Sequence, residues 1–277
     1  QVYKYLDIGT NKEGEWDAKK GSRVIDGISQ YLTDVIEPSE IFSAGKFIEL
    51  AKRQISNIKK KGKVPIVVGG TGLYVRALID GFSKMPEKND EIRKQLNDDL
   101  KKHGTQYLYK ELQKIDPTSA EKNKTNPHRL IRALEVFKIT GTPISILQKK
   151  NEIPKDEFIQ FGLSWPREVL YDKINDRAKQ MLKIGMIEET RNVLKMNFSK
   201  ECQGLLGIGY RSIVKYIDGK IKIDDVETQL QADTRHYAKR QITWFKRDKR
   251  INWIEVEEKS FHPEDIADKI IKIYLKV

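Results

Sequence analysis

A hydroxyl side chain sits in a glycine turn of a kind that can bind phosphate. Residues 64–68 form a short apolar run typical of a buried parallel strand, and Gly69-Gly70-Thr71-Gly72 follows directly before a helical pattern. Such a turn can direct backbone N–H groups and the positive end of a helix toward a phosphate. It does not match the dinucleotide fingerprint, because residue 75 is valine. By itself it fits equally well a tight corner in which Thr71 only caps a helix.

Positive charge is concentrated in residues 234–250. On one continuous helix, four cations would fall within about one sixth of a turn: Arg235, Lys239, Lys246 and Arg250. An apolar stripe beside them would face the core: Ala238, Ile242 and Phe245. A cationic ridge of this kind suits a phosphate backbone, and three aromatic rings could stack on bases: His236, Tyr237 and Trp244. The alternative is a solvated basic face with Trp244 in the core.

Two further groups of arginines have both a functional and a structural interpretation. Arg177 lies near the apolar face set by Ile174 and Met181, where it could clamp a diphosphate or pair with an Asp. The residues alone favour the ion pair. Arg129 and Arg132, at i and i+3, make a small cationic patch that indicates only surface solubility unless a polyanion is already implied.

Composition narrows the class of protein. The chain has 277 residues and a net charge of +12, which favours a polyanionic partner, although a lysine-rich composition can arise without one. One cysteine and four histidines give no metal-ligand spacing, so neither a zinc site nor an internal disulfide is expected. No apolar run is long enough to span a membrane. We expect a cytoplasmic location and a monomer.

The order of elements predicts an α/β core, at residues 1–86 and 158–277, interrupted by a helical insertion at residues 87–157. The predicted strands cover residues 64–68, 158–164 and 251–255. The predicted core helices cover residues 47–61, 72–81, 167–184, 186–196, 209–218, 225–246 and 263–275. Within the insertion, helices are predicted at residues 91–102 and 107–114, and after Asn126-Pro127, where Asn caps and Pro opens a helix.

Several segments together carry a resemblance to a known family. They are Pro65-Ile-Val-Val-Gly-Gly-Thr-Gly-Leu-Tyr74, Asn126-Pro-His-Arg-Leu-Ile-Arg-Ala-Leu-Glu135, Gly207-Ile-Gly-Tyr210 and Ala238-Lys-Arg-Gln-Ile-Thr-Trp-Phe245. The opening residues 1–12 are similar to the segment that follows the family's catalytic Asp. In this order and spacing the chain resembles the tRNA dimethylallyltransferases, the isopentenyl-transferases of adenosine-37, over nearly its whole length.

The resemblance implies a reaction. A dimethylallyl group moves from dimethylallyl diphosphate to the N6 amine of an adenine beside the tRNA anticodon. A carboxylate would take the proton of the weakly nucleophilic amine, and cations and N–H donors would stabilise the leaving diphosphate. The adenine must leave its stack to reach the donor. The implied partners are the anticodon stem-loop and dimethylallyl diphosphate, with Mg²⁺ as cofactor.

The resemblance also assigns roles residue by residue. It places Thr71 near the reacting centre and the target adenosine, and Arg177 on the diphosphate, which reverses the ion-pair interpretation. Gln1 would end an Asp-Ser-x-Gln motif that meets the target nucleotide. Positions that match tRNA contacts are Arg93, then His128, Arg129, Leu130, Ile131 and Arg132, and, within residues 206–211, Gly209, Tyr210 and Arg211. The basic helix would line the channel with Lys239, Arg240, Gln241 and Trp244, and which of these contact substrate is left open.

The sequence departs from the family pattern in three places. No Gly-x-x-x-x-Gly-Lys-[Ser/Thr] phosphate loop occurs, and the catalytic Asp expected ahead of Gln1 is not among the residues. Gln30 and Tyr31 replace the histidines of a His-His-Leu-Ile-Asp run, and Arg211 stands where Lys is common. We therefore expect a P-loop-kinase-like parallel sheet that lacks its first strand, its phosphate loop and its Mg²⁺ ligands. Such a fragment is expected to be inactive, and destabilised by exposed strand edges.

Three rival functions are weighed against tRNA modification. An adenylate isopentenyltransferase shares the core, but a free nucleotide requires neither the helical insertion nor the basic helix. A non-catalytic RNA-binding remnant would keep tRNA binding without transfer. A nucleotide kinase would leave the basic ridge unexplained.

Overall fold

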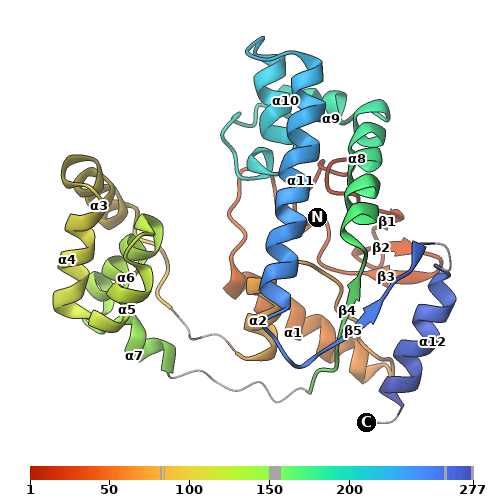
Figure 1. Ribbon diagram of the computed structural model, residues 1–277, viewed down its shortest axis with the longest axis horizontal. Helices are drawn as coiled ribbons and strands as arrows, with labels where there is room; N and C mark the ends of the chain where they lie inside the picture. Colours follow the sequence, from red (N-terminus) through yellow and green to blue (C-terminus); the bar gives the residue numbers. More distant parts are fainter. Residues whose placement is uncertain (82, 84, 150–156, 259–260, 276–277) are drawn as a thin grey trace. The chain divides into compact units, whose positions relative to one another are not determined.

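The computed structural model describes residues 1–81, 83, 85–149, 157–258 and 261–275. The chain divides into two compact units (Figure 1). The first, the core unit, combines Gln1–Val75 with Phe158–Val277, and the second, the helical unit, is Arg76–Glu157. The sequence predicted an insertion at residues 87–157. This range ends where the helical unit ends, but it begins later in the chain than Arg76.

The helical unit contains no strand among its described residues. Its helices are α3 (Asp90–His103), α4 (Thr105–Ile115), α5 (Pro117–Asn123), α6 (Pro127–Thr140) and α7 (Ile144–Lys149). Asn126 caps α6 through its side-chain oxygen, as the sequence predicts. Asp116 does the same for α5, where the sequence indicated only a turn. Leucines from α3, α4 and α6 form the buried core of this unit.

The core unit carries the remaining helices: α1 (Ala44–Lys60), α8 (Arg167–Lys183), α9 (Met186–Lys195), α10 (Tyr210–Ile217), α11 (Ile223–Phe245) and α12 (Pro263–Tyr274). The short helix α2 (Gly72–Ile79) crosses the division between the units, and a 3-10 turn covers Gly204–Leu206. The predicted helices are confirmed to within a few residues at each end. Helices α8 and α11 pack side by side (Figure 1), and the main core lies beneath α8, α9 and α10, with Leu6, Met186 and Leu205 at its centre.

A parallel pair of strands forms the α/β part of the fold. Strand β4 (Gln160–Ser164) pairs with β5 (Ile251–Glu255), with Gln160 opposite Ile251 and Ser164 opposite Glu255. Two strands so distant in sequence need a long crossover, which α8 to α11 supply. The strand predictions at residues 158–164 and 251–255 are confirmed.

The third predicted strand, at residues 64–68, is wrong as a buried element. The structure assigns no strand there, and Ile66 and Val68 are 82% and 90% exposed. A continuous apolar run becomes a buried strand only when neighbours pair with both of its edges. Among the described residues no strand pairs with this segment.

A small antiparallel sheet was not predicted. It consists of β1 (Glu15–Asp17), β2 (Ser22–Ile25) and β3 (Ile28–Gln30), in that spatial order. The tight turn between β2 and β3 has positive φ at both Asp26 and Gly27. This is the backbone of a two-residue hairpin turn, and an Asp-Gly pair between short strands was a signal that could have identified it.

Candidate functional site

The glycine turn and the basic helix, which are far apart in the sequence, meet in the structure. Gln241 Nε2 on α11 donates a hydrogen bond of 3.1 Å to the carbonyl of Gly70. A Cβ at Gly70 would lie 1.9 Å from Gln241 Nε2, and one at Gly72 would lie 2.3 Å from the ring of Trp244. The two glycines are therefore required by the close approach of α11. This is the contact that brings the two motifs together.

Thr71 lies between those glycines and is exposed. Its carbonyl accepts hydrogen bonds from Tyr74 N (2.9 Å) and Val75 N (3.1 Å), which starts α2. Within the described part of the chain, no hydrogen bond occupies its hydroxyl or its own N–H. The ring of Tyr74 stacks on Phe47 of α1 with centroids 4.9 Å apart, which fixes the first turn of α2. Thr71 thus presents free hydrogen-bonding groups from a held position.

Arg177, on α8, has no ion-pair partner within the described residues. The interpretation as an internal ion pair with an Asp is therefore wrong. Burial lowers the pKa of its guanidinium from the ordinary value, and the more distant charge of Glu13 opposes that shift. The group stays protonated at neutral pH. An exposed arginine without a carboxylate partner is suited to an incoming anion.

The N-terminal segment is held by a ring of charges. Lys12, whose side chain is fully buried, donates to Asp7 Oδ1 (2.7 Å), to Tyr3 O (2.6 Å) and to Asp34. Arg23 closes the ring on Asp34 Oδ2 (2.7 Å) and Asp7 Oδ2 (2.8 Å). Burial raises the pKa of Asp7, but the hydrogen bonds from the two cations outweigh it and the net pKa is lowered.

Gln1 uses its amide within this segment. Its Nε2 donates to the carbonyls of Thr10 (3.0 Å) and Asn11 (2.9 Å), and its Oε1 faces the Gln30 amide at 3.5 Å. Both amide hydrogens are therefore already bonded inside the chain. Within the described residues, the oxygen accepts only the long contact from Gln30.

The motif at residues 207–210 has a structural role at Tyr210. Its side chain is 1% exposed, and its hydroxyl donates to Glu189 Oε1 at 2.6 Å. Burial, followed by the charge of Glu189, raises the pKa of this phenol far above its ordinary value. The assignment of the Tyr210 side chain to tRNA does not fit this burial. Gly209 also packs, with positive φ and no room for a Cβ beside Leu230, whereas Arg211 is exposed.

In the helical unit, the predicted tRNA contacts divide into two groups. Leu130 and Ile131 belong to the core, so their side chains are not available to RNA. Arg93 and Arg132 bind the fully buried Glu135, with 2.8 Å from Arg93 Nε to Glu135 Oε1. They are ion-pair partners, which the sequence did not indicate.

The exposed residues at the start of α6 are His128 and Arg129. With one carboxylate for two arginines, the nearby Glu135 cluster also retains a net positive charge. The N-terminal end of α6 therefore carries an exposed, positively charged surface.

The cationic ridge is shorter than predicted, because α11 ends at Phe245. Arg250 lies beyond the helix and pairs with Asp248 at 2.6 Å, and Arg235 bonds Asn175 on α8. Lys239 and Arg240 remain exposed, and Arg240 lies over the Tyr237 ring. The predicted apolar stripe is wrong for the same half of α11: Ile242 is 36% exposed, and the buried residues are Val226 and Leu230.

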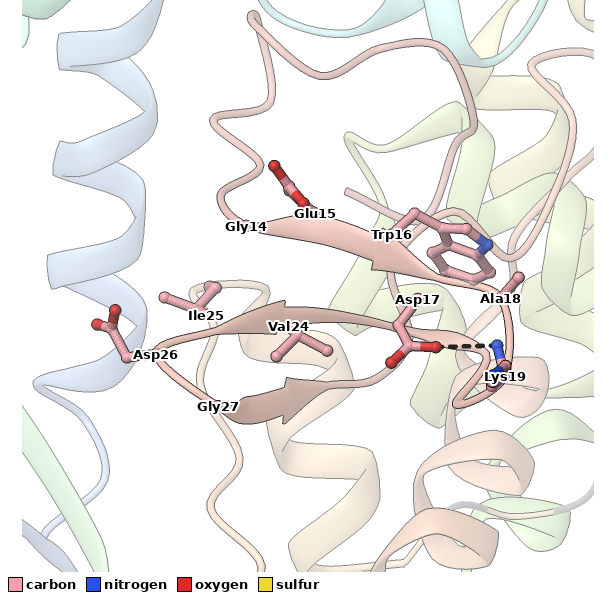
Figure 2. Close-up of a pocket in the computed structure, with 10 residues that line it drawn as sticks. All are labelled: Gly14, Glu15, Trp16, Asp17, Ala18, Lys19, Val24, Ile25, Asp26 and Gly27. Atoms are coloured by element: carbon pink, nitrogen blue, oxygen red, sulfur yellow. Dashed lines mark hydrogen bonds between the residues drawn. The ribbon is translucent and has the colours of Figure 1, made fainter.

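An open hollow of about 770 Å³ is lined by residues 14–19 and 24–27 of the β1–β2 part of the small sheet. Figure 2 shows these lining residues. None of the predicted site residues lines it. The described residues contain no cluster of three or more His, Cys, Asp or Glu that could hold a metal ion. They also form no helix long and apolar enough to cross a membrane.

The comparisons with known proteins define this mixed α/β protein as a transferase. The chain belongs to the IPP transferase family, whose model matches residues 1–248. It is 49% identical over 246 residues to a tRNA dimethylallyltransferase of Endomicrobium trichonymphae, covering 89% of this chain and 80% of that protein. The family resemblance seen in the sequence is thereby confirmed.

Solved structures agree. The full-length tRNA isopentenylpyrophosphate transferase of Bacillus halodurans is 34% identical, with a TM-score of 0.64, covering 99% of this chain and 82% of that one. A eukaryotic dimethylallyltransferase described as acting on tRNA shares the fold with a TM-score of 0.79 at 24% identity, covering 100% of this chain and 71% of that one.

Proposed function

We propose that this protein transfers a dimethylallyl group from dimethylallyl diphosphate to the N6 amine of the adenine at position 37 in tRNA. The observation that carries the proposal is Arg177, an exposed cation without a carboxylate partner in the described structure, on a chain that belongs to the IPP transferase family. Arg177 binds the diphosphate and stabilises the charge that develops on it as the allylic bond breaks.

Thr71 supplies the second group at the reaction centre. Its free hydroxyl and N–H, held between Gly70 and Gly72, orient the target nucleotide beside the donor. The base leaves its stack to enter, because the amine is out of reach within a stacked loop. Lys239 and Arg240 bind the RNA backbone near the turn, and His128 and Arg129 do so on the helical unit.

Three properties stay predictions. The first is that Mg²⁺ assists the diphosphate, although the described residues offer no ligand cluster and no step here depends on it. The second is that the protein is a cytoplasmic monomer. The third is that these 277 residues alone transfer very slowly or not at all, because their sequence contains no lysine phosphate loop. Loss of such preorganised donors lowers a rate by a factor on the order of 10² or more.

A transfer assay tests the proposal. Radiolabelled dimethylallyl diphosphate is incubated with excess protein and one of three acceptors: an anticodon stem-loop with adenine at the target position, the same loop with guanine, or AMP. The Bacillus halodurans relative, assayed in parallel, calibrates the rate. Label is expected in the adenine loop alone, at a rate well below that of the relative.

Each rival predicts a different pattern. Label in AMP and not in RNA would establish the adenylate isopentenyltransferase and reject tRNA modification. An RNA-binding remnant would bind the stem-loop and leave it unlabelled even when the upstream phosphate loop and Asp of the relative are joined to this chain.

A further inference from the structure

We propose that Gln241 is the positioning residue for Thr71, and that it acts on the target nucleotide through the Gly70–Thr71 peptide without touching the substrate. The inference rests on the proposed function of Thr71. Sequence patterns left open whether Gln241 contacts substrate or packs. In the structure its Nε2 donates a hydrogen bond of 3.1 Å to the Gly70 carbonyl, so its side chain holds the turn that carries Thr71.

The bond sets the direction of the Thr71 amide. In a trans peptide the carbonyl and the following N–H point in opposite directions, and the described chain contains no cis peptide. Because the Gly70 carbonyl points at α11, the N–H of Thr71 points away from that helix. That N–H has no acceptor in the described structure, so it is free for a ligand.

Packing on both sides of Thr71 supports the same conclusion. A Cβ on Gly70 would lie 2.8 Å from Gln241 Cδ, so the amide occupies the space that a side chain would need. On the other side, Gly72 lies under the Trp244 ring. Gln241 and Trp244 are three positions apart on α11 and face the same turn. One helix face thus fixes the peptides before and after Thr71.

The first test uses the free protein. Gln241→Met keeps the side-chain volume and removes the donor. The matched control is Gln231→Met, on the same helix, whose amide donates to Glu227 Oε1 (3.0 Å) and does not reach the turn. Hydrogen exchange is measured at the Tyr74 and Val75 amides, whose acceptor is the Thr71 carbonyl. We expect these two amides to exchange about tenfold faster in Gln241→Met and at the wild-type rate in Gln231→Met.

The second test uses RNA. Affinity is measured for two stem-loops, one with adenine at the target position and one abasic there. Gln241→Met and Thr71→Ala are each expected to lower the affinity for the adenine loop about tenfold. The affinity for the abasic loop is expected to stay within about twofold of the wild-type value. Because Gln241 positions both the hydroxyl and the N–H of Thr71, whereas Thr71→Ala removes only the hydroxyl, the double variant is expected to bind no more weakly than Gln241→Met.

The outcomes separate the two claims. Unchanged exchange in Gln241→Met overturns the positioning role, whatever the RNA does. Effects that multiply in the double variant, or equal weakening of both loops by Gln241→Met, overturn it as well. Failure of the wild-type chain to distinguish the adenine loop from the abasic loop instead contradicts the function proposed for Thr71, and the inference falls with it.

Discussion

The hydroxyl of Tyr210 donates a 2.6 Å hydrogen bond to Glu189 Oε1. The other carboxylate oxygen, Oε2, accepts the backbone N–H groups of Asp7 (2.6 Å) and Ile8 (2.7 Å). One side chain of α9 therefore ties α10 to the N-terminal segment that carries Gln1. A Cβ on Gly9 would lie 2.5 Å from the Tyr210 hydroxyl, which explains the glycine.

Tyr210→Phe is expected to destabilise the core unit. The variant leaves Glu189 with one hydrogen bond fewer in a partly buried place, a cost of about 1–2 kcal/mol. For a chain of this size, that corresponds to a fall of about 2–8 °C in the thermal midpoint. The matched control is Tyr109→Phe, which removes an exposed 3.0 Å bond to Glu121 and is expected to leave the midpoint unchanged. Equal midpoints for all three proteins would refute the role of Glu189.

Gly70→Ala is expected to displace the turn that carries Thr71. The new Cβ would meet Gln241 Nε2 at 1.9 Å, so either the turn or α11 must move, at a cost of about 1–3 kcal/mol. Gly69→Ala is the matched control, because a Cβ there meets no atom within 4 Å. Urea unfolding measures the free energy of unfolding of both variants. A Gly70→Ala protein as stable as Gly69→Ala would show that the turn and α11 are not in contact in solution.

Glu135→Gln is expected to remove an acid-dependent part of the stability of the helical unit. Burial raises the pKa of Glu135, but hydrogen bonds from Arg93, Arg132 and the Asn89 N–H outweigh it, so the folded-state pKa lies below the ordinary value of 4.5. The carboxylate therefore stabilises the fold above about pH 4.5, and that contribution is lost as pH falls through the folded pKa.

At neutral pH the Glu135→Gln variant should be less stable than the wild type by roughly 1.5–3 kcal/mol. Thermal unfolding from pH 7 to pH 3 checks this, since the two curves should converge at the acid end. Parallel curves over the whole range would mean that Glu135 is not ionised in the folded protein.

Arg177→Gln is expected to weaken the binding of inorganic diphosphate by about tenfold or more, because the free guanidinium is the clamp. The affinity for an anticodon stem-loop should stay within about twofold. Arg191→Gln, on α9, is the control, since Arg191 already pairs with Glu188 at 3.2 Å. Calorimetric titration with diphosphate and with the stem-loop measures both affinities for each variant. Equal diphosphate affinity in the two variants would remove Arg177 from the donor site.

Local patterns predicted most of the helices and the two parallel strands. Asn126-Pro127 marks the start of α6 because a side-chain cap and a fixed φ act within one turn of the chain. The Asp26-Gly27 hairpin was equally local and was overlooked. The segment at residues 64–68 could not be judged in this way, because its burial depends on strands that must pair with it from elsewhere.

The candidate site residues also divide into those that the sequence marked and those whose partners depend on the tertiary structure. Residue types marked the glycine turn and the exposed cations of α11 as candidates, whereas Arg177 became a candidate only through the family resemblance. The partners of Arg93, Arg132 and Tyr210 were not predicted, because only the tertiary structure establishes that Glu135 is buried and that Glu189 lies beside Tyr210. Arginines on an amphipathic helix look alike in sequence whether they face RNA or a buried carboxylate.

The most direct measurement is the affinity of this chain for anticodon stem-loops with adenine or guanine at the target position, with AMP as competitor. It requires no catalysis, so it does not depend on the phosphate loop. We predict binding of the adenine loop at least about fivefold tighter than the guanine loop, and no displacement by AMP at concentrations that saturate a nucleotide site. Equal affinity for both loops, or displacement of the RNA by AMP, would contradict the claim that the chain recognises an adenine within tRNA.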